Sequence, residues 1–342
     1  MRQVLVLNSR FTREGFGVQA DGLDLKFHGG PGDPTDPPPA EECAAAEAVI
    51  GIAAQHDIGP PSTYPRARIV LRMGVGFDNI DGALWGAAGV PLCNVPDYGT
   101  SEVADHAIAL MLALCRGTAT YQDRLVRDPA AGWDSSAAPL VRRLRGATFG
   151  VVGLGRIGLA AALRAKAFGM ELAFYDPYAP NGFEIAVGAR RVHGLHDLMS
   201  ISDVLSIHAP LSDETRGMID AAALAAAKPG LVLINTARGP IVDVGALHQA
   251  LREGRIAGAG LDVLPHEPPL TAEGPSADLL RALHDGAPYL RDRLVVSPHA
   301  AFYSPDAVRD MRRKAVGVVR DYLCDGRLSN CVNSAHLRRP LR

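Results

Sequence analysis

Three side chains capable of acid–base or charge chemistry follow predicted strands in the second half of the chain: Arg238, Glu267 and His299. The strands before them are short apolar runs, namely Leu231–Ile234, Ala257–Leu261 and Leu294–Val296. If these strands are parallel, their carboxyl ends meet at one edge of a sheet, and so do the three side chains. A guanidinium, a carboxylate and an imidazole at one edge are the groups that hydride transfer to a 2-keto acid requires.

Each of the three residues suits one task in that chemistry. Arg238 offers a planar, permanently charged group that binds a carboxylate and polarises a ketone. His299 is able to protonate the ketone oxygen near neutral pH, and Glu267 would orient the imidazole and favour its protonated form. Taken singly, such residues are more often a surface ion pair, a loop residue and a capped turn. Their joint placement favours a catalytic site.

A cofactor for that reaction is indicated by Phe149–Gly158, where a β-branched apolar run leads into the glycine pattern G-x-G-x-x-G. A helix-favouring segment, Leu159–Phe168, follows. Gly153 permits a tight turn, Gly155 a close approach of the backbone to a pyrophosphate, and Gly158 the packing of helix on strand. The first N–H groups of the helix would then face the phosphates.

The predicted strand Glu171–Tyr175 ends at Asp176, about 20 residues beyond the glycines, where this pattern places a carboxylate for the adenosine ribose. A carboxylate accepts hydrogen bonds from ribose hydroxyls and repels a 2′-phosphate. The sequence therefore predicts NAD rather than NADP as the cofactor. Arg190 and Arg191 leave the opposite preference open, because an arginine near Asp176 would attract that phosphate.

Composition and charge narrow the class of protein. The 342 residues suffice for two domains, and 35 basic against 37 acidic residues give no surplus for binding nucleic acid. The five cysteines are widely spaced and form no C-x-x-C pair, which predicts reduced thiols of a cytoplasmic protein. We expect no metal site, no signal peptide and no membrane span, since no apolar segment approaches the roughly 20 residues that a bilayer requires.

Strands and helices alternate along most of the chain, which is typical of a parallel, doubly wound α/β sheet. We predict two domains: a Rossmann-type NAD-binding domain at residues 97–302, and a discontinuous, flavodoxin-like substrate domain at residues 1–96 and 303–342. A final helix from Pro305 to about Leu323 would return to the first domain. The residues between Leu7 and Glu41 are predicted to be irregular, followed by a helix at Glu41–Ala48.

Two segments near the domain junction carry further signals. Gly74–Asn79 is a glycine turn after a predicted strand, and its N–H groups at Val75 and Gly76 either bind an anion or merely form a turn. Thr100 or Ser101 caps a predicted helix, Val103–Cys115, that is apolar on nearly every side. Such a helix is buried, here between domains or between subunits.

Together these motifs resemble the D-specific 2-hydroxyacid dehydrogenases over roughly residues 66 to 333, and most closely the branch of the C-terminal-binding proteins. The matching segments are Gly74–Asn79, Asn94–His106, Gly153–Gly158, Asn235–Gly239, Asp262–Pro268 and Ser297–His299. Segments similar to that branch include Leu163–Gly169, Phe174–Tyr178 and Asn330–Asn333.

The resemblance implies an NAD-dependent enzyme that interconverts a 2-keto acid and a D-2-hydroxy acid, with the catalytic trio in the roles given above. It implies that Val75, Gly76 and Phe302 contact the substrate, and that a two-fold homodimer packs through the helix near residues 100–118. The implied cofactor-binding residues are Thr100, Gly153, Gly155, Arg156, Ile157, Gly158, Asp176, His208, Ala209, Pro210, Thr215, Thr236, Ala237 and Asp262.

The chain departs from the family pattern at three places. Phe302 stands where corepressors of the branch have tryptophan, Leu270–Arg293 is longer than expected and would form a lid or an extra surface element, and residues 1–60 match poorly. Two other functions stay open: an NADH-sensing binding protein like those corepressors, and formate- or phosphite-type oxidation on the same fold. Formate-type relatives have glutamine where Glu267 stands, which favours hydroxy acid chemistry here.

Overall fold

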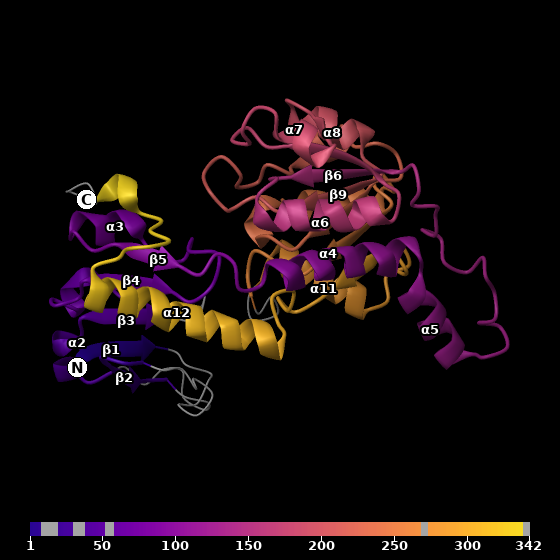
Figure 1. Ribbon diagram of the computed structural model, residues 1–342. Helices are drawn as coiled ribbons and strands as arrows, with labels where there is room; N and C mark the ends of the chain where they lie inside the picture. The colour runs from indigo at the N-terminus through magenta and orange to yellow at the C-terminus, as the bar shows by residue number, and fades with distance from the viewer. Residues whose placement is uncertain (8–19, 30–37, 52–57, 268–272, 338–342) are drawn as a thin grey trace. The chain divides into compact units, whose positions relative to one another are not determined.

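The computed structural model describes residues 1–7, 20–29, 38–51, 58–267 and 273–337, and it divides into two compact units (Figure 1). Unit 1 comprises Met1–Gly99 and Tyr303–Arg342, and unit 2 comprises Thr100–Phe302. Each unit is built on one parallel sheet. This confirms the predicted α/β fold with two doubly wound sheets.

Unit 1 contains a five-stranded sheet in the order β2-β1-β3-β4-β5. The strands are β1 (Arg2–Leu7), β2 (Leu23–Phe27), β3 (Ala48–Gly51), β4 (Ile69–Arg72) and β5 (Leu92–Asn94). The helices are α2 (Ala40–Ala45), α3 (Gly82–Ala87) and α12 (Pro305–Asp325), with the short 3-10 turns η1 (Pro61–Thr63) and η4 (Ser334–His336).

Helices cover both faces of this sheet, which explains why its strands are continuous apolar runs. Val4 and Val6 of β1 face a core that includes buried residues of α12. Leu5 and Leu7 point to the opposite face, into a core that contains Trp85 of α3. Helix α12 lies beside β1 to β4 although it comes from the far end of the chain (Figure 1).

Two predictions for the start of the chain were wrong. The strand β2 lies where we expected irregular structure, and it pairs only with β1, at the edge of the sheet. Its residues are mostly half-buried and two of them are charged, so it lacks the apolar run of a central strand. The expected helix at Glu41–Ala48 ends at Ala45, because Ala48 already belongs to β3.

Unit 2 contains a seven-stranded sheet in the order β12-β11-β10-β9-β6-β7-β8. The strands are β6 (Thr148–Val152), β7 (Glu171–Tyr175), β8 (Arg190–Arg191), β9 (Val204–Ile207), β10 (Val232–Asn235), β11 (Gly258–Leu261) and β12 (Leu294–Val296). The helices are α4 (Thr100–Cys115), α5 (Thr118–Arg127), α6 (Arg156–Ala167), α7 (Phe183–Val187), α8 (Leu195–Ile201), α9 (Ala221–Ala225), α10 (Val244–Arg252) and α11 (Pro275–His284), with the 3-10 turn η2 (Gly239–Ile241).

Helices α4 and α6 lie next to one another over one face of this sheet (Figure 1). The apolar residues of α4 are buried against this sheet and α6, so much of its apolar surface is covered within unit 2. The close approach depends on Gly260 in β11, since a β-carbon there would lie 2.9 Å from Cβ of Leu110. The opposite face of the sheet is covered by a core that includes residues of α8 to α11.

The insertion after Glu267 contributes to this second core. Its described part contains α11, whose Ala277 and Leu279 are buried and which packs beside α10. The predicted extra element is thus a helix anchored in unit 2, and residues 270–272 of the insertion lie outside the described residues. Helix α5 was not predicted, because its sequence is mostly polar and its apolar residues are few.

Candidate active site

The sheet of unit 2 has a switch point between β6 and β9, where the strand order runs one way to β8 and the other way to β12. Ligands of open α/β sheets bind at such a point, beyond the carboxyl ends of the strands. The glycine turn follows β6, and the loop that begins with His208 follows β9. The strands that precede Arg238, Glu267 and His299 are β10, β11 and β12, which are adjacent in the sheet.

The three glycines of the turn occupy different environments. Gly153 has a φ of 85°, and a β-carbon there would lie 2.8 Å from the backbone of Ala209. A β-carbon on Gly158 would lie 2.1 Å from the carbonyl oxygen of Gly153. By contrast, no heavy atom of the described residues, apart from the adjoining chain, lies within 4 Å of a β-carbon placed on Gly155. The turn is therefore closely packed at two glycines and open at the third.

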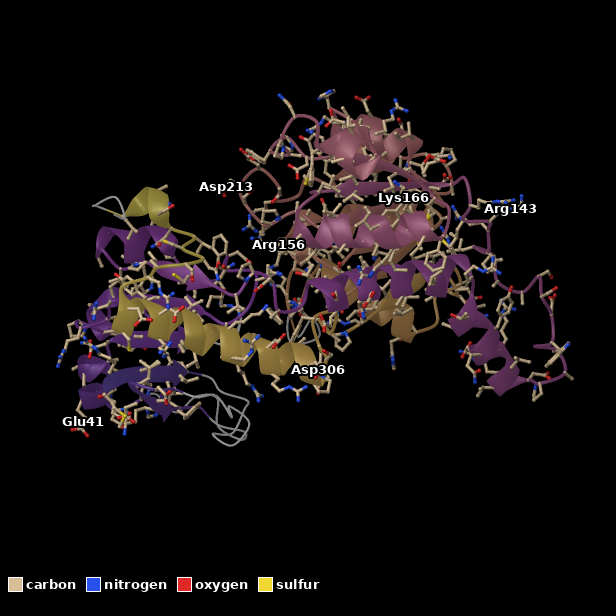
Figure 2. All side chains as sticks on the ribbon, viewed as in Figure 1. Glu41, Arg143, Arg156, Lys166, Asp213 and Asp306 are labelled. Carbon is tan, nitrogen blue, oxygen red and sulfur yellow. The ribbon has the colours of Figure 1, made fainter. Side chains whose placement is uncertain are left out.

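Gly155 is also the N-terminal flank of α6, and no side chain caps the first turn of that helix. Unpaired backbone N–H groups at a helix N-terminus attract phosphate. Figure 2 shows Arg156 at the start of α6, with Asp213 of the loop after β9 at the same end of the unit. The open glycine and the uncapped helix fit the pyrophosphate of a dinucleotide.

Asp176 directly follows β7, next to the glycine turn. Its Oδ2 accepts a hydrogen bond from the N–H of Leu154 at 2.9 Å, and its Oδ1 accepts one from the N–H of Tyr178. The carboxylate is thus fixed by backbone donors on both oxygens, and each oxygen retains acceptor capacity for a ribose hydroxyl.

Arg191 is not available for a 2′-phosphate in this arrangement. Its guanidinium donates to Oε2 of Glu184 at 2.8 Å and to the carbonyl oxygens of Ala179 and Pro180, and it lies over the ring of Phe174. These contacts occupy the nitrogens of the guanidinium. Of the two arginines that left an NADP preference open, Arg190 is exposed and Arg191 is engaged within unit 2.

The buried polar atoms without a hydrogen-bond partner among the described residues include Oγ1 of Thr100, Nδ1 of His208 and Oγ1 of Thr236. All three belong to residues predicted to bind the cofactor. Burial lowers the pKa of His208 to about 4, so its imidazole is neutral at pH 7, and its Nε2 pairs with Oγ of Ser206 at 2.8 Å. An unpaired buried polar atom is unfavourable by about 1–3 kcal/mol. Hydrogen bonds from a bound dinucleotide would relieve that penalty.

The loop that carries Arg238 is held by Asn235, the last residue of β10, which is 1% exposed. The amide Nδ2 of Asn235 donates to the carbonyl oxygen of Arg238 at 2.9 Å, and its Oδ1 accepts from the N–H of Ala237 at 3.0 Å. Asn235 thus ties both ends of a short loop to the strand. The half-buried guanidinium of Arg238 extends from this fixed backbone.

Glu267 and His299 form a close pair. Oε2 of Glu267 lies 2.6 Å from Nδ1 of His299, and its Oε1 accepts from the N–H of Leu264 at 2.9 Å. Burial acts to raise the pKa of Glu267, but the hydrogen bond and charge of His299, the Leu264 N–H and the charge of Arg238 together hold it below its ordinary value. The carboxylate is therefore ionised at neutral pH, and it occupies Nδ1 of the imidazole rather than Nε2. The imidazole also forms a T-shaped pair with the ring of Phe302, with ring centroids 6.2 Å apart.

In unit 1, the turn after β4 presents two backbone donors. The N–H groups of Val75 and Gly76 have no acceptor among the residues described. The carbonyl oxygen of Val75 is held by Nδ2 of Asn94 at 2.6 Å. The guanidinium of Arg72 lies against the same turn, since a β-carbon on Gly74 would be 2.5 Å from its Nη1. Free donors and a cation at one turn suit an anion better than a structural turn alone.

Residues 108–301 match the family described as D-isomer specific 2-hydroxyacid dehydrogenase, NAD binding domain. The chain is 40% identical over 240 residues to a glyoxylate reductase of Korarchaeum cryptofilum, covering 69% of this chain and 67% of that protein. The chain belongs to the D-isomer specific 2-hydroxyacid dehydrogenase family.

Other known proteins are also similar to this chain. C-terminal-binding protein 1 of Caenorhabditis elegans is 32% identical over 286 residues, which are 80% of this chain but only 37% of that protein. The crystal structure of D-lactate dehydrogenase from Aquifex aeolicus, complexed with NAD and lactic acid, superposes with a TM-score of 0.82 at 29% identity. That superposition covers 96% of this chain and 99% of the other. The family confirms the predicted resemblance and NAD as the class of cofactor.

The predicted site residues divide between the two units. Val75 and Gly76 belong to unit 1, and all the others belong to unit 2, at or just beyond the carboxyl ends of β6, β7, β9, β10, β11 and β12, apart from Thr100 at the start of α4. Within the loop after β9, the hydroxyl of Thr215 donates to the carbonyl oxygen of Pro210 at 2.7 Å. This hydrogen bond closes the loop after β9, in which the backbone of Ala209 lies close to Gly153.

Asp262 has contacts that the sequence did not predict. It is 2% exposed, and its carboxylate accepts hydrogen bonds from Oγ of Ser297 and from the N–H groups of Ala300 and Ala301, at 2.6 to 3.0 Å. Its carbonyl oxygen accepts from the N–H of His299 at 2.8 Å. Asp262 thus holds the loop that carries the imidazole, whatever it contributes to the cofactor. The position of an acidic residue directly after a strand was the one feature of the sequence that pointed to these contacts.

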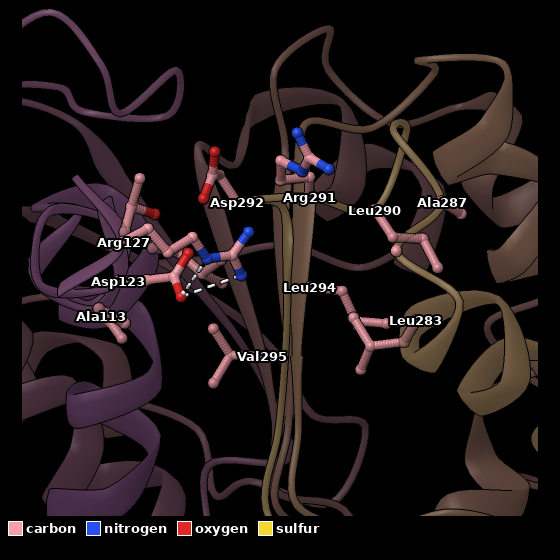
Figure 3. A pocket seen from close by; sticks show the side chains of 14 residues that line it. Ala113, Asp123, Arg127, Leu283, Ala287, Leu290, Arg291, Asp292, Leu294 and Val295 are labelled. Carbon is pink, nitrogen blue, oxygen red and sulfur yellow. Dashed lines mark hydrogen bonds and ion pairs between the residues drawn. The ribbon is translucent and has the colours of Figure 1, made fainter. Parts of the chain in front are cut away.

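A hollow of about 260 Å³ lies elsewhere in unit 2, between α4, α5, α11 and β12 (Figure 3). Its lining consists of Ala113, Leu114, Ala119, Thr120, Asp123, Arg127, Leu283, Gly286, Ala287, Leu290, Arg291, Asp292, Leu294 and Val295. Asp123 and Arg127 form an ion pair of 3.0 Å at its rim. No predicted site residue lines it, so it is distinct from the candidate active site.

Across the residues that the structure describes, no helix is both long and apolar enough to cross a membrane.

Proposed function

We propose that this chain reduces a small 2-keto acid to a D-2-hydroxy acid with NADH, or catalyses the reverse reaction. The observation that carries the proposal is the Glu267–His299 pair beside Arg238, beyond the ends of strands that belong to the same sheet as the open glycine turn. Residues 97–302 would act as the NAD-binding domain, and residues 1–96 with 303–342 as the substrate domain. The family and the glyoxylate reductase relative support this assignment.

When bound, NADH supplies the hydride that adds to the ketone carbon. Arg238 binds the substrate carboxylate and polarises the ketone, because its guanidinium offers two parallel donors. Nε2 of His299 donates the proton that the reduced oxygen requires, while Glu267 at Nδ1 holds the imidazole in place. The N–H groups of Val75 and Gly76, with Arg72 behind their turn, hold a substrate anion from unit 1.

Asp176, the open Gly155 and the N-terminus of α6 would bind the adenosine ribose and the pyrophosphate. Thr100, His208 and Thr236 would pair their buried polar atoms with the cofactor. Asp176 would select NADH over NADPH, and the engagement of Arg191 by Glu184 supports that preference. These assignments predict tight binding of NADH even when no keto acid is present.

The test is turnover of NADH by purified protein with glyoxylate, hydroxypyruvate, phenylpyruvate and phosphonopyruvate, together with NAD and phosphite or formate for the oxidative alternative. We expect oxidation of NADH with at least one keto acid. Failure of all four keto acids, with NADH binding intact, would reject the dehydrogenase function.

A second candidate function is that of an NADH-sensing binding protein, favoured by the similarity to C-terminal-binding protein 1. It predicts NADH binding that changes the affinity for a protein partner, without turnover of any keto acid. The turnover panel separates the two functions. Oxidation of NADH with any of the keto acids supports the enzyme, whereas NADH binding without turnover supports the binding protein.

We further propose that the active form is a homodimer in a reducing, cytoplasmic compartment. Val126 and Trp133 on α5 and the segment after it are 71% and 84% exposed, which supports burial by a second copy. The five free cysteines are consistent with a reducing compartment. Sedimentation should show a dimer, and Trp133→Ser should shift it toward monomer; a wild-type monomer at all concentrations would refute the assembly.

A further inference from the structure

We propose that His106 is a positioning residue for the acid–base group His299, and that it acts through Ser297 and Asp262. The inference rests on the function proposed above, and it assigns a role to a helix residue that does not contact the imidazole. His106 lies on α4, whereas Ser297 and His299 follow β12 and Asp262 follows β11. Three separate elements of unit 2 therefore meet in one polar cluster.

The contacts within the cluster form a chain. Nε2 of His106 lies 2.8 Å from Oγ of Ser297, and 3.5 Å from Oδ1 of Asp262. Oγ of Ser297 donates to Oδ1 of Asp262 at 2.6 Å. The same carboxylate accepts from the N–H groups of Ala300 and Ala301. His106 thus contacts Ser297, which precedes His299, and is linked through Ser297 and Asp262 to the backbone that follows His299.

The hydrogens in this chain have one consistent assignment. The serine hydroxyl has a single hydrogen, and an ionised carboxylate is an acceptor only, so that hydrogen belongs between Ser297 and Asp262. Ser297 must then accept from Nε2–H of His106. This places a hydrogen on Nε2 of His106 and leaves the hydroxyl of Ser297 to donate to the carboxylate of Asp262, which is almost fully buried.

The backbone of His299 explains why such a clamp is needed. His299 has a φ of 52°, which is uncommon for a residue other than glycine, and its N–H donates to the carbonyl oxygen of Asp262 at 2.8 Å. Without the clamp, a relaxed backbone would turn the imidazole away from Glu267 and from the substrate. Misplacement of an acid–base group affects the chemical step more than ground-state binding.

The experiment compares His106→Ala, which removes the donor, with His106→Gln, which retains an N–H donor on a side chain of similar reach. His196→Ala is the matched control, since His196 is an exposed histidine on helix α8 of the same unit. For each protein, kcat and KM are measured with the keto acid that the wild type turns over. Hydrogen exchange of the Ala300 and Ala301 amides is measured without ligand.

We expect His106→Ala to lower kcat about tenfold, with KM changed less than about twofold, because one hydrogen bond of the clamp is lost. Exchange at Ala300 and Ala301 should accelerate by about the same factor. His106→Gln should recover most of both losses, and His196→Ala should match the wild type. If a His106 variant does not fold, Ser297→Ala and Ser297→Thr replace the two His106 variants. Ser297→Ala removes the hydroxyl and should lower kcat, and Ser297→Thr retains the hydroxyl and should recover most of that loss.

Wild-type kcat and exchange in His106→Ala would overturn the proposal, as would equal losses in His106→Ala and His106→Gln. A wild-type protein without turnover rejects the dehydrogenase function instead. In that case the exchange rates still decide whether His106 holds the loop, because they require neither cofactor nor substrate.

Discussion

Replacing single glycines of the turn after β6 distinguishes the glycine that the stability of the fold requires from the glycine that binding of the cofactor requires. The backbone of Gly155 has φ −75° and ψ −162°, which alanine adopts readily, and its β-carbon would meet no atom of the described chain beyond its neighbours. The β-carbon of an alanine at position 158 would instead lie 2.1 Å from a backbone oxygen. Gly155→Ala should therefore spare stability, whereas Gly158→Ala should not.

The magnitudes follow from these environments. We expect Gly155→Ala to change the free energy of unfolding by less than about 0.5 kcal/mol, since no atom must move and the unfolded chain loses some freedom. If the pyrophosphate occupies the open space, the added methyl group breaks a charge-assisted hydrogen bond worth roughly 1.5–3 kcal/mol. That is about ten- to hundredfold in the Kd for NADH. Gly158→Ala should cost about 1–3 kcal/mol or more in stability through overpacking.

The assays are urea denaturation of the ligand-free protein and titration of NADH fluorescence. Gly317→Ala is the control. This glycine lies in helix α12, where a β-carbon would have no neighbour within 4 Å among the described residues outside the helix's own backbone, so alanine should stabilise the protein by about 0.5–1 kcal/mol without altering NADH binding. Wild-type NADH affinity in Gly155→Ala would refute the assigned pyrophosphate position. A fully stable Gly158→Ala would refute the packing of α6 on the turn.

Three further predictions concern charged residues of the site. Arg238→Ala should reduce kcat/KM at least about a hundredfold while the Kd for NADH stays near wild type; near-normal turnover would reject its role. Asp176→Asn should lower the preference for NADH over NADPH at least about tenfold, because repulsion of the 2′-phosphate is lost, and the ratio of kcat/KM values measures it. The pKa of Glu267 is lowered in the folded protein, so its carboxylate stabilises the fold fully above the ordinary value of 4.5 and loses that contribution as the pH falls through the lower folded value. The difference in unfolding free energy between wild type and Glu267→Gln should accordingly be constant near neutral pH and shrink below pH 4.5, whereas a pH-independent difference would exclude an ionised Glu267.

Local patterns predicted candidate site residues that lie within a few residues of a strand end. The glycine turn, Asp176 and the three predicted catalytic residues each follow an apolar run, and parallel pairing brings such positions to one edge. Strand β2 was missed because an edge strand is only half-buried and has no continuous apolar run. Helix α5 was missed for the corresponding reason, since few of its residues are buried.

The residues that hold the site rigid were beyond the reach of local patterns. Asn235 acts within its own loop, but Asp262 binds backbone groups 38 and 39 residues away, and His106 pairs with a serine 191 residues away. No periodicity or spacing connects such partners. Their pairing is a property of the folded sheet, which brings the ends of β11 and β12 and the first turns of α4 together.

The contacts of Asp262 make the fold and the proposed activity depend on the same carboxylate. It is buried, and it accepts from one hydroxyl and two backbone N–H groups that all belong to the loop after β12. Removing the carboxylate would leave those donors without partners, which is unfavourable for a buried site. It would also release the backbone that holds His299 in its uncommon conformation. A change at Asp262 should consequently lower stability and turnover together, whereas a change at Arg238, which projects from the loop that Asn235 braces, should lower turnover alone.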